Sequence, residues 1–348
     1  SRRRGRRGAL ARLMRVFVTQ PIAASALARL RQVAEVEVNP DAGKPIDKQA
    51  LCAGVRRAEI LYALLHDRVD RDVIAANPRL RMIASMAITP DNIAVAEATA
   101  RRILVTVIPP IVGEATADVA FGLMLAVARR LVEGDRLVRQ GRFPGSQSSL
   151  LAGAGVCGKV LGLIGGGGRI GRAVARRAKG FAMQVLYWGP RRMPEADERA
   201  LGMAYVGFDE VFRNSDFVSI HAPLREETRH LVGARELALM QPSAFLINTA
   251  RGALVDEAAL IRALGERRIA GAGLDVFEHE PFVEPELLAM SNVVLAPHLG
   301  SAVVELREQM ANIVVDNILA VLAGRPPPNC VNPEVYAEDG ERSVEARS

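Results

Sequence analysis

Residues Val160 to Gly171 read VLGLIGGGGRIG, a short apolar run that passes directly into a glycine-rich turn. The run predicts a buried strand over residues 160–164, and the residues after the turn predict a helix over Arg172–Lys179. A strand, a glycine turn and a helix in immediate succession are typical of the first unit of a doubly wound α/β sheet. This stretch therefore decides the fold class that we expect for the chain.

Three glycines in the turn, Gly166, Gly168 and Gly171, fit the pattern G-x-G-x-x-G, although the register that begins at Gly165 is also open. Glycines at those places allow a tight turn, the approach of a pyrophosphate to the backbone, and close packing of helix on strand. We interpret the turn as a dinucleotide site. The alternative is a glycine-rich turn that packs a helix on a sheet and binds nothing.

Short apolar runs alternate with amphipathic stretches along the chain, which predicts parallel sheets covered by helices. The predicted strands are residues 15–19, 59–65, 80–85, 103–107, 160–165, 183–188, 216–220, 244–248, 271–275 and 292–295. The longest helical pattern runs from Glu114 to Arg139, and its apolar face consists of Ala120, Leu123, Val127 and Leu131. An irregular segment is expected over residues 143–158, which are rich in glycine and serine.

The 348 residues are 49% hydrophobic and 24% charged, which is enough for two domains with large buried cores and excludes a disordered chain. The net charge of +6 is carried by six arginines within residues 1–13, because the remaining positive and negative charges balance. We therefore predict no nucleic-acid partner and expect residues 1–13 to be a disordered extension or a mis-start upstream of Met14. The alternative is a basic arm for nucleic acid. A second disordered tail is expected at residues 336–348.

Three widely separated cysteines, Cys52, Cys157 and Cys330, suggest neither a disulfide framework nor a zinc site. No apolar run approaches the ~20 residues that a membrane-spanning helix needs. We therefore predict a cytoplasmic protein that has no metal and no membrane partner.

The segment after the second strand of the dinucleotide unit reads Trp188-Gly189-Pro190-Arg191-Arg192. A site for NAD(H) usually has an acidic residue here that binds the ribose 2′-hydroxyl, whereas arginines can bind a 2′-phosphate. Because no acid occurs before Glu195, we favour NADP(H) as the cofactor. NAD(H) remains possible if both arginines are only solvated surface residues.

Three strings, NTARG from Asn248, GLDVFEHEP from Gly273 and PHLGS from Pro297, each close a predicted strand. Because the carboxyl ends of parallel strands share one edge of a sheet, Arg251, Glu280 and His298 are expected to converge. The arginine can bind a carboxylate, and the histidine can give or take a hydroxyl proton. A buried Glu280 beside His298 would raise the histidine pKa and keep the ring protonated for the reduction of a carbonyl.

The strings G-x-G-R-I-G, T-A-R-G-x-x-V-D-E, G-L-D-V-F-x-x-E-P and P-H-L-G-S occur in this order. Over about residues 59–333 the chain resembles the D-isomer-specific 2-hydroxyacid dehydrogenases, particularly the glyoxylate/hydroxypyruvate reductase branch. The resemblance implies that Arg251 binds substrate, that His298 is the acid/base with Glu280 as its partner, and that Asp275 meets the nicotinamide amide.

The resemblance and the motifs together give the following predicted sites. The cofactor-binding residues are Gly166, Gly168, Arg169, Ile170, Gly171, Trp188, Gly189, Pro190, Arg191, Arg192, His221, Ala222, Pro223, Thr228, Thr249, Ala250, Asp275, His298 and Gly300. The substrate-binding residues are Leu65, Ile88, Thr89, Arg251 and His298. His221 is expected to form part of the cofactor wall rather than to act as a catalyst.

The architecture of the family implies two Rossmann-like doubly wound domains, of which the substrate-binding one is discontinuous. That domain would comprise residues 14–112 and 300–335, around a dinucleotide-binding domain at 113–299. The long helix from Glu114 would then lie at the domain junction and at the interface of a homodimer.

One loop departs from the family. Where its members read approximately Val-Gly-x-Asp-Asn-Ile-Asp and present backbone N–H groups to the substrate carboxylate, this chain has Ile88-Thr89-Pro90-Asp91-Asn92-Ile93-Ala94. Proline fixes its own φ and biases Thr89 toward an extended backbone. Residues Val107-Ile108-Pro109-Pro110 similarly replace an Asn-Thr-Pro-Gly stretch of the family. These departures leave the choice of substrate open.

We predict an NADP(H)-preferring reductase that converts a small 2-oxo acid, such as glyoxylate or hydroxypyruvate, to the D-2-hydroxy acid. One alternative is a dehydrogenase of phosphite or a phosphonate, because relatives of this fold oxidise phosphite. Another is a dinucleotide-sensing interaction protein, similar to the transcriptional corepressors built on the same fold.

Overall fold

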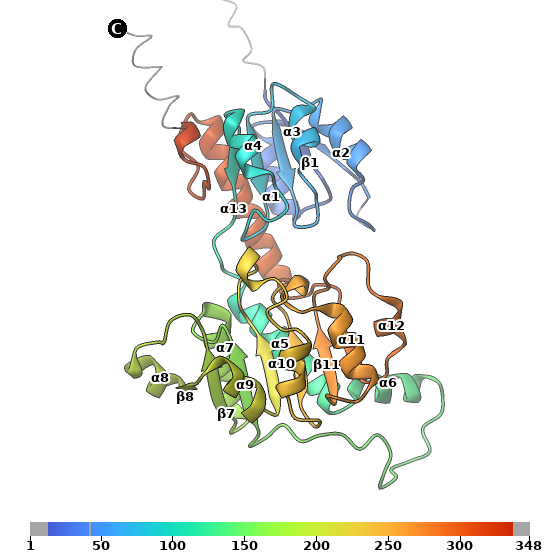
Figure 1. Ribbon diagram of the computed structural model, residues 1–348. Coiled ribbons are helices and arrows are strands. Elements are labelled where there is room, and N and C mark those ends of the chain that lie inside the picture. Colours follow the sequence, from blue (N-terminus) through green and yellow to red (C-terminus); the bar gives the residue numbers. More distant parts are fainter. Residues whose placement is uncertain (1–12, 42, 337–348) are drawn as a thin grey trace, which may run out of the picture. The chain divides into compact units, whose positions relative to one another are not determined.

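The computed structural model describes residues 13–41 and 43–336, and the chain divides into two compact units (Figure 1). Of the described residues, unit 1 contains those up to Ile111 and those from Val303 onward, whereas unit 2 is Val112–Ala302. Unit 1 is therefore made from two separate parts of the chain. The tails predicted at residues 1–13 and 336–348 lie outside the described residues, apart from Leu13 and Tyr336.

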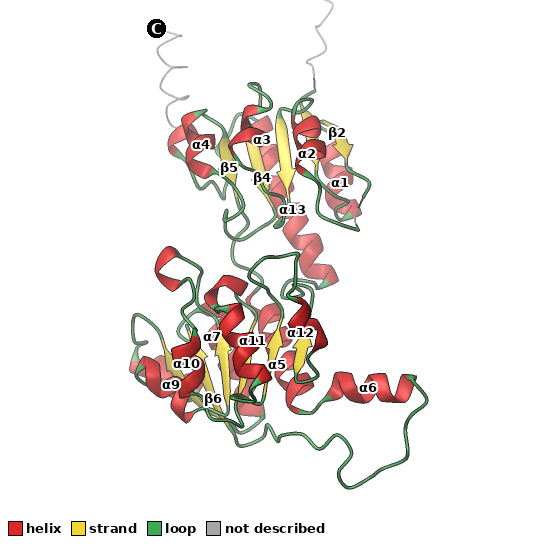
Figure 2. Ribbon diagram, turned by 45° about the vertical axis from the view of Figure 1, so that its right-hand side comes forward, coloured by secondary structure: helices red, strands yellow, loops and turns green. Residues whose placement is uncertain are grey.

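Unit 2 is built on a seven-stranded parallel sheet (Figure 2). Its strands, in their order across the sheet, are β12 (Val293–Leu295), β11 (Gly271–Leu274), β10 (Phe245–Asn248), β9 (Phe217–Ile220), β6 (Val160–Ile164), β7 (Gln184–Trp188) and β8 (Met203–Tyr205). The chain proceeds from β6 to β8 in one direction and from β9 to β12 in the other. In open sheets of this kind, ligands bind beyond the carboxyl ends of the strands at such a reversal.

Helices cover both faces of this sheet. The helices of unit 2 are α5 (Gly113–Ala128), α6 (Leu131–Arg139), α7 (Arg169–Gly180), α8 (Glu195–Leu201), α9 (Phe208–Asn214), α10 (Ala234–Leu239), α11 (Glu257–Gly265) and α12 (Pro285–Ala289), with short 3-10 helices η1 (Glu226–Thr228) and η2 (Gly252–Leu254). α5 and α7 pack on one face, and α9, α10 and α11 pack on the other. Because both faces are covered, the residues of the central strands β6, β9, β10 and β11 are nearly all buried instead of alternating between buried and exposed.

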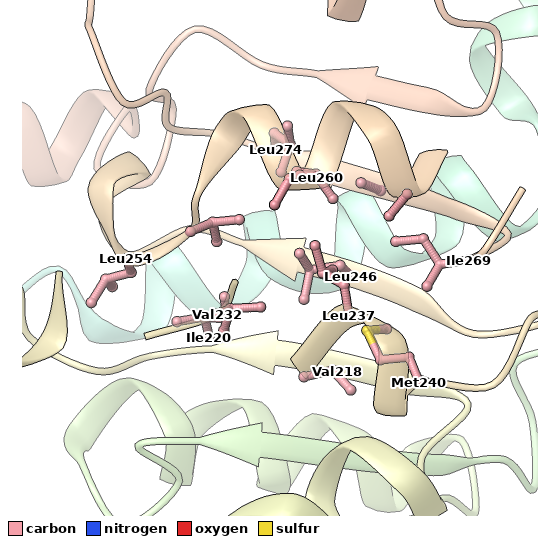
Figure 3. Close-up of a cluster of buried hydrophobic side chains, with 14 of the residues drawn as sticks. Val218, Ile220, Val232, Leu237, Met240, Leu246, Leu254, Leu260, Ile269 and Leu274 are labelled. Atoms are coloured by element: carbon pink, nitrogen blue, oxygen red, sulfur yellow. The ribbon is translucent and has the colours of Figure 1, made fainter. Parts of the chain in front are cut away.

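The core beneath α10 and α11 shows how the second face is filled (Figure 3). Val218 and Leu246 from the strands belong to the same buried cluster as Leu237 and Leu260 from the helices. All four side chains are essentially inaccessible to solvent. This packing supports the strands β10 and β11, and the loops that follow them contain Arg251 and Glu280, two of the predicted catalytic residues; the third, His298, follows β12.

The single helix predicted from Glu114 to Arg139 is wrong, because the structure divides it into α5 and α6. Arg130 between them has a φ of 54°, in the left-handed region. The N–H of Ala154 donates to the Ala128 carbonyl at 2.8 Å, so the returning chain takes the acceptor that a continuing helix would use. Leu131, predicted to be on the buried face, is consequently 56% exposed.

Unit 1 contains a five-stranded parallel sheet with helices on both faces (Figure 2). Its strands, in order across the sheet, are β2 (Glu35–Val38), β1 (Arg15–Val18), β3 (Ile60–Ala63), β4 (Met82–Ser85) and β5 (Leu104–Thr106). Its helices are α1 (Ala24–Arg31), α2 (Lys48–Val55), α3 (Arg71–Ala75), α4 (Val95–Ala100) and α13 (Val304–Leu322). The two parallel sheets confirm the predicted fold class of two doubly wound α/β domains.

All ten predicted strands are present, and two further strands, β2 and β8, lie at sheet edges. Edge strands are short and partly solvated, so they lack the apolar runs that mark the central strands. Within residues 13–41 and 43–336, no helix is both long and apolar enough to cross a membrane.

Candidate active site

The glycine turn leads from β6 into α7, which begins at Arg169, three residues earlier than predicted. Gly165 has a φ of 82°, a conformation that L side chains rarely adopt. A Cβ on Gly166 would lie 2.6 Å from the Cβ of Tyr187, and one on Gly171 would lie 2.5 Å from the Cα of Gly166. The helix thus rests directly on the turn, an arrangement that fits the register Gly166, Gly168, Gly171.

This turn has the properties that a dinucleotide requires. It consists of residues without side chains and lies at the N-terminus of a twelve-residue helix whose first turn contains no acid. Such a terminus attracts the negative charge of a pyrophosphate. In addition, the Thr249 hydroxyl is buried and has no hydrogen-bond partner within the described part of the chain. The residues present therefore fit a nicotinamide dinucleotide, held by the turn and by groups following the neighbouring strands.

The two arginines after β7 have different surroundings. Arg192 forms a two-pronged ion pair with Glu198, at 2.9 Å from Nε and 2.8 Å from Nη2, and Tyr187 donates to the same carboxylate at 2.6 Å. These contacts lower the pKa of Glu198 to about 2, and burial, together with the hydrogen bond to Glu198, raises the pKa of Tyr187 to about 12. Arg191 is exposed and has no ion pair with any described residue. Arg191 is therefore the uncompensated positive charge at this strand end.

Arg251 follows β10 in a turn that Asn248 closes. The Asn248 side chain accepts from the Ala250 N–H at 3.0 Å and donates to the Arg251 carbonyl at 2.9 Å. The Arg251 guanidinium donates to the Ala250 carbonyl at 2.8 Å. The tight turn places Arg251 just beyond the carboxyl end of β10, where the sequence predicted a substrate-binding residue.

Glu280 and His298 come together, as the sequence predicted. Nδ1 of His298 lies 2.9 Å from Oε2 of Glu280, and Oε1 of the same carboxylate accepts from the Phe277 N–H at 3.0 Å. Both side chains are mostly buried, at 20% and 17% exposed. The carboxylate is thus oriented from one side by the backbone and presents its other oxygen to the imidazole.

Asp275 organises the backbone on either side of this histidine. Its carboxylate accepts from the N–H groups of Leu299 at 2.6 Å and Gly300 at 2.8 Å, while its carbonyl accepts from the His298 N–H at 2.9 Å. Burial raises the pKa of Asp275, and the backbone donors oppose this shift. His298 itself has a φ of 56°. A left-handed backbone at a non-glycine residue is strained, and such strain persists where the surroundings hold it.

Two other predicted cofactor residues have internal partners. His221 is buried with Nε2 2.9 Å from the Ser219 hydroxyl, and burial lowers its pKa to about 4, so the ring is neutral near pH 7. The Thr228 hydroxyl donates to the Pro223 carbonyl at 2.8 Å and accepts from the Arg225 N–H at 2.7 Å. A neutral imidazole fits a wall residue better than a proton donor.

The predicted substrate residues of unit 1 lie in two adjacent loops, Leu65 after β3 and Ile88 and Thr89 after β4. Asn92 joins these loops, because its side chain donates to the carbonyls of Leu64 at 3.0 Å and Asp67 at 2.7 Å. The Thr89 hydroxyl donates to Asp91 at 2.8 Å.

Sequence reasoning missed several residues that support these groups: Glu198, Asn248, Gly252, Glu257, Glu278 and His230. Glu198 carried no signal, because a carboxylate six residues beyond an arginine is common on surfaces. Asn248 at a strand end, before a sharp turn, is a residue whose side chain typically bonds to nearby backbone, and it was detectable on that ground.

Comparisons with known proteins point to one family. The family described as "D-isomer specific 2-hydroxyacid dehydrogenase, NAD binding domain" matches residues 121–300. The glyoxylate reductase of Thermococcus litoralis is 47% identical over 325 residues, which cover 92% of this chain and 97% of that protein.

Solved structures agree with this result. A protein from Thermus thermophilus superposes with a TM-score of 0.83 at 42% identity, covering 91% of this chain and all of the other. An NADPH-dependent glyoxylate/hydroxypyruvate reductase from Sinorhizobium meliloti, in complex with NADP and malonate, gives 0.77 at 33% identity, covering 91% and 96% of the two chains.

Proposed function

The chain belongs to the D-isomer-specific 2-hydroxyacid dehydrogenase family, and from this premise we propose that it reduces a small 2-oxo acid to the D-2-hydroxy acid. It is an NAD(P)-dependent oxidoreductase of 2-hydroxy acids. The observation that carries the proposal is the contact between His298 and Glu280. Both residues follow the carboxyl ends of strands in the same sheet, as do Arg251 and the glycine turn.

In the proposed mechanism, Arg251 binds the carboxylate of the oxo acid by charge-assisted hydrogen bonds. We propose that Glu280 is ionised and that Nδ1 of His298 donates to it over the 2.9 Å contact, because an ionised carboxylate only accepts hydrogen bonds. Nε2 then carries the proton that passes to the carbonyl oxygen, and Glu280 stabilises the imidazolium before the transfer. A bound nicotinamide dinucleotide supplies the hydride that reduces the carbonyl carbon.

We propose glyoxylate or hydroxypyruvate as the substrate type, in keeping with the names of the relatives from Thermococcus litoralis and Sinorhizobium meliloti. The test is a panel of 2-oxo acids with NADPH and NADH, together with phosphite and NADP⁺, followed at the absorbance of the reduced nicotinamide. Turnover of a small oxo acid supports the proposal. Turnover of phosphite alone would identify the alternative that the Ile88-Thr89-Pro90 loop left open.

We further propose a preference for NADP(H), carried by Arg191. The exposed Arg191 guanidinium has no ion pair with a described residue, so it can bind a 2′-phosphate without breaking an existing contact. The charge of Arg192 is already paired with Glu198. The role of Arg192 is then to fix the loop after β7. The same panel tests this preference through the ratio of kcat/KM with the two cofactors.

A homodimer is the proposed assembly. Helix α6 buries none of its residues, and Leu131, Val138 and Phe143 in and after it are 56%, 58% and 59% exposed. Figure 1 shows α6 and the following segment extending away from the sheet of unit 2. Apolar side chains on such an extension are typical of an interface between protein chains.

Sedimentation of the native chain at several concentrations tests this assembly. L131E together with V138E is expected to give monomers, whereas V33E, on another partly exposed valine, is the matched control. A monomeric native chain would remove the proposal.

A further inference from the structure

Two acidic residues outside the proposed catalytic set, Glu257 and Glu278, exchange hydrogen bonds across the site. Oε2 of Glu257 accepts from the Glu278 N–H at 3.1 Å, and Oε2 of Glu278 accepts from the Glu257 N–H at 3.4 Å. Glu257 is the first residue of α11, shortly after Arg251, while Glu278 follows β11 two residues before Glu280. The exchange therefore connects the segment of the arginine with the segment of the glutamate.

Close packing of the backbone reinforces this connection. A Cβ on Gly252 would overlap the carbonyl group of Phe277 and the nitrogen of Glu278, so only glycine allows the two segments to approach this closely. The Phe277 N–H is the group that donates to Oε1 of Glu280 at 3.0 Å. The backbone held by Gly252 and Glu257 is thus the same short stretch that orients Glu280 toward His298.

His230, from a third segment of the chain, contacts one of these two glutamates, Glu278. Its Nε2 lies 2.5 Å from Oε1 of Glu278, and its N–H donates to the Ala253 carbonyl at 2.8 Å, within η2. The two oxygens of Glu278 are therefore divided between His230 and the amide of Glu257. A rotation of the Glu278 carboxylate would break one or both of these contacts.

We propose that Glu257 and Glu278, with Gly252 and His230, form a clamp that positions Glu280 against His298 and couples that position to the Arg251 turn. The clamp rests on the proposed function, because it acts through Glu280. Neither glutamate is proposed to touch the substrate. Glu257 and Glu278 are positioning residues, and their effect on turnover passes through the orientation of the Glu280 carboxylate.

The surroundings of Glu257 suggest which substitution separates hydrogen bonding from charge. Glu257 is only 7% exposed, and its Oε1 has no hydrogen-bond partner in the described part of the chain. Burial raises its pKa, the nearby carboxylates Glu278 and Glu284 add to the shift, and His279 opposes it. A neutral glutamine retains an oxygen that can accept from the Glu278 N–H, so Glu257→Gln is expected to preserve the clamp.

The experiment compares Glu257→Ala with Glu257→Gln and with a control on the same helix, Asp256→Ala. Asp256 caps α11 by accepting from the Ala259 N–H at 2.9 Å, so its loss weakens the helix without removing a contact of the clamp. Glu257→Ala is expected to lower kcat roughly 10- to 100-fold and to shift the pH profile of kcat/KM, because Glu280 is misplaced. Glu257→Gln should restore both, and Asp256→Ala should lower the midpoint of thermal unfolding while leaving the pH profile unchanged.

A double-mutant cycle with Glu280→Gln decides whether the effect passes through Glu280. If it does, Glu257→Ala should add little to the loss already caused by Glu280→Gln. The proposal would be overturned if the losses of kcat in the two single variants multiplied fully in the double variant. It would also be overturned if Glu257→Ala folded and kept the native kcat and pH profile. If Glu257→Ala does not fold, Glu278→Ala replaces it in the cycle. The same loss of kcat is expected, and a native kcat and pH profile would again contradict the proposal.

This outcome is distinguishable from failure of the proposed function. Unimpaired turnover by a His298→Ala variant would contradict the catalytic assignment itself. Loss of turnover in that variant, together with native behaviour of Glu257→Ala and Glu278→Ala, would contradict the clamp alone.

Discussion

Nδ1 of His298 lies 2.9 Å from Oε2 of Glu280, although 18 residues separate them along the chain. The contact joins the loop after β11 to the loop after β12, and Asp275 holds the histidine backbone in its left-handed conformation. An imidazole oriented by a carboxylate in this way is suited to general acid catalysis. Substitution of either residue therefore tests the proposed active site most directly.

Replacing His298 by alanine is expected to lower kcat by roughly 10²- to 10⁴-fold, because the proton donor to the carbonyl oxygen is lost. Glu280→Gln should lower kcat less and move the pH dependence of kcat/KM, since the imidazolium loses its counter-charge. Dinucleotide affinity, measured by fluorescence titration, should be retained in both. The matched control is His279→Ala, on an exposed histidine in the same segment, and comparable losses in that variant would refute the assignment.

The two arginines after β7 should respond differently to substitution. Arg191→Gln is expected to raise KM for NADPH by roughly tenfold or more with little effect on NADH, because it removes a charged hydrogen bond to the 2′-phosphate. Arg192→Gln should mainly destabilise the loop, since it leaves Glu198 without its ion pair. Steady-state kinetics with both cofactors, with Arg199→Gln as the surface control, make the comparison. Equal kcat/KM of the native chain with NADH and NADPH would contradict the proposed preference for NADP(H).

A side chain at the turn should block the cofactor. Gly171→Ala places a methyl group against the backbone of Gly166, and overpacking of this kind costs about 1–3 kcal/mol. We expect dinucleotide affinity to fall by about tenfold or more as the turn shifts. Gly180→Ala, at the other end of α7, meets no atom within 4 Å and serves as the control. Calorimetric titration that finds the same affinity in both variants would argue against the turn as the pyrophosphate site.

The buried His221 should make stability depend on pH. Its pKa in the folded chain is about 4, below the ordinary 6.5, so the fold favours the neutral ring. The corresponding stabilisation is complete above pH 6.5 and is lost as the pH falls toward 4, by up to roughly 3 kcal/mol. His221→Gln, which can still contact Ser219, should show a shallower decline of the unfolding free energy between pH 6.5 and 4. Equal slopes in denaturant titrations of the two proteins would contradict the neutral buried state.

Much of the fold was predictable because central parallel strands are buried on both faces and so appear as apolar runs. The edge strand β2, Glu35-Val36-Glu37-Val38, has an alternating pattern that was available but overlooked. The three-residue β8 carried no comparable signal. The break between α5 and α6 could not be predicted locally, because it depends on Ala154 bonding to the Ala128 carbonyl from 26 residues away.

The sequence by itself determined the ten strands other than β2 and β8, the glycine turn, and the presence of Arg251, Glu280 and His298 at strand ends. Repeated apolar patterns and residues with special backbone freedom act over a few neighbouring positions, so they can be identified from the chain. Only the tertiary structure decided which acid serves which partner: Glu198 binds Arg192, Glu278 binds His230, and Glu280 contacts His298. Such pairs depend on differences of about an ångström, which the packing of distant segments sets.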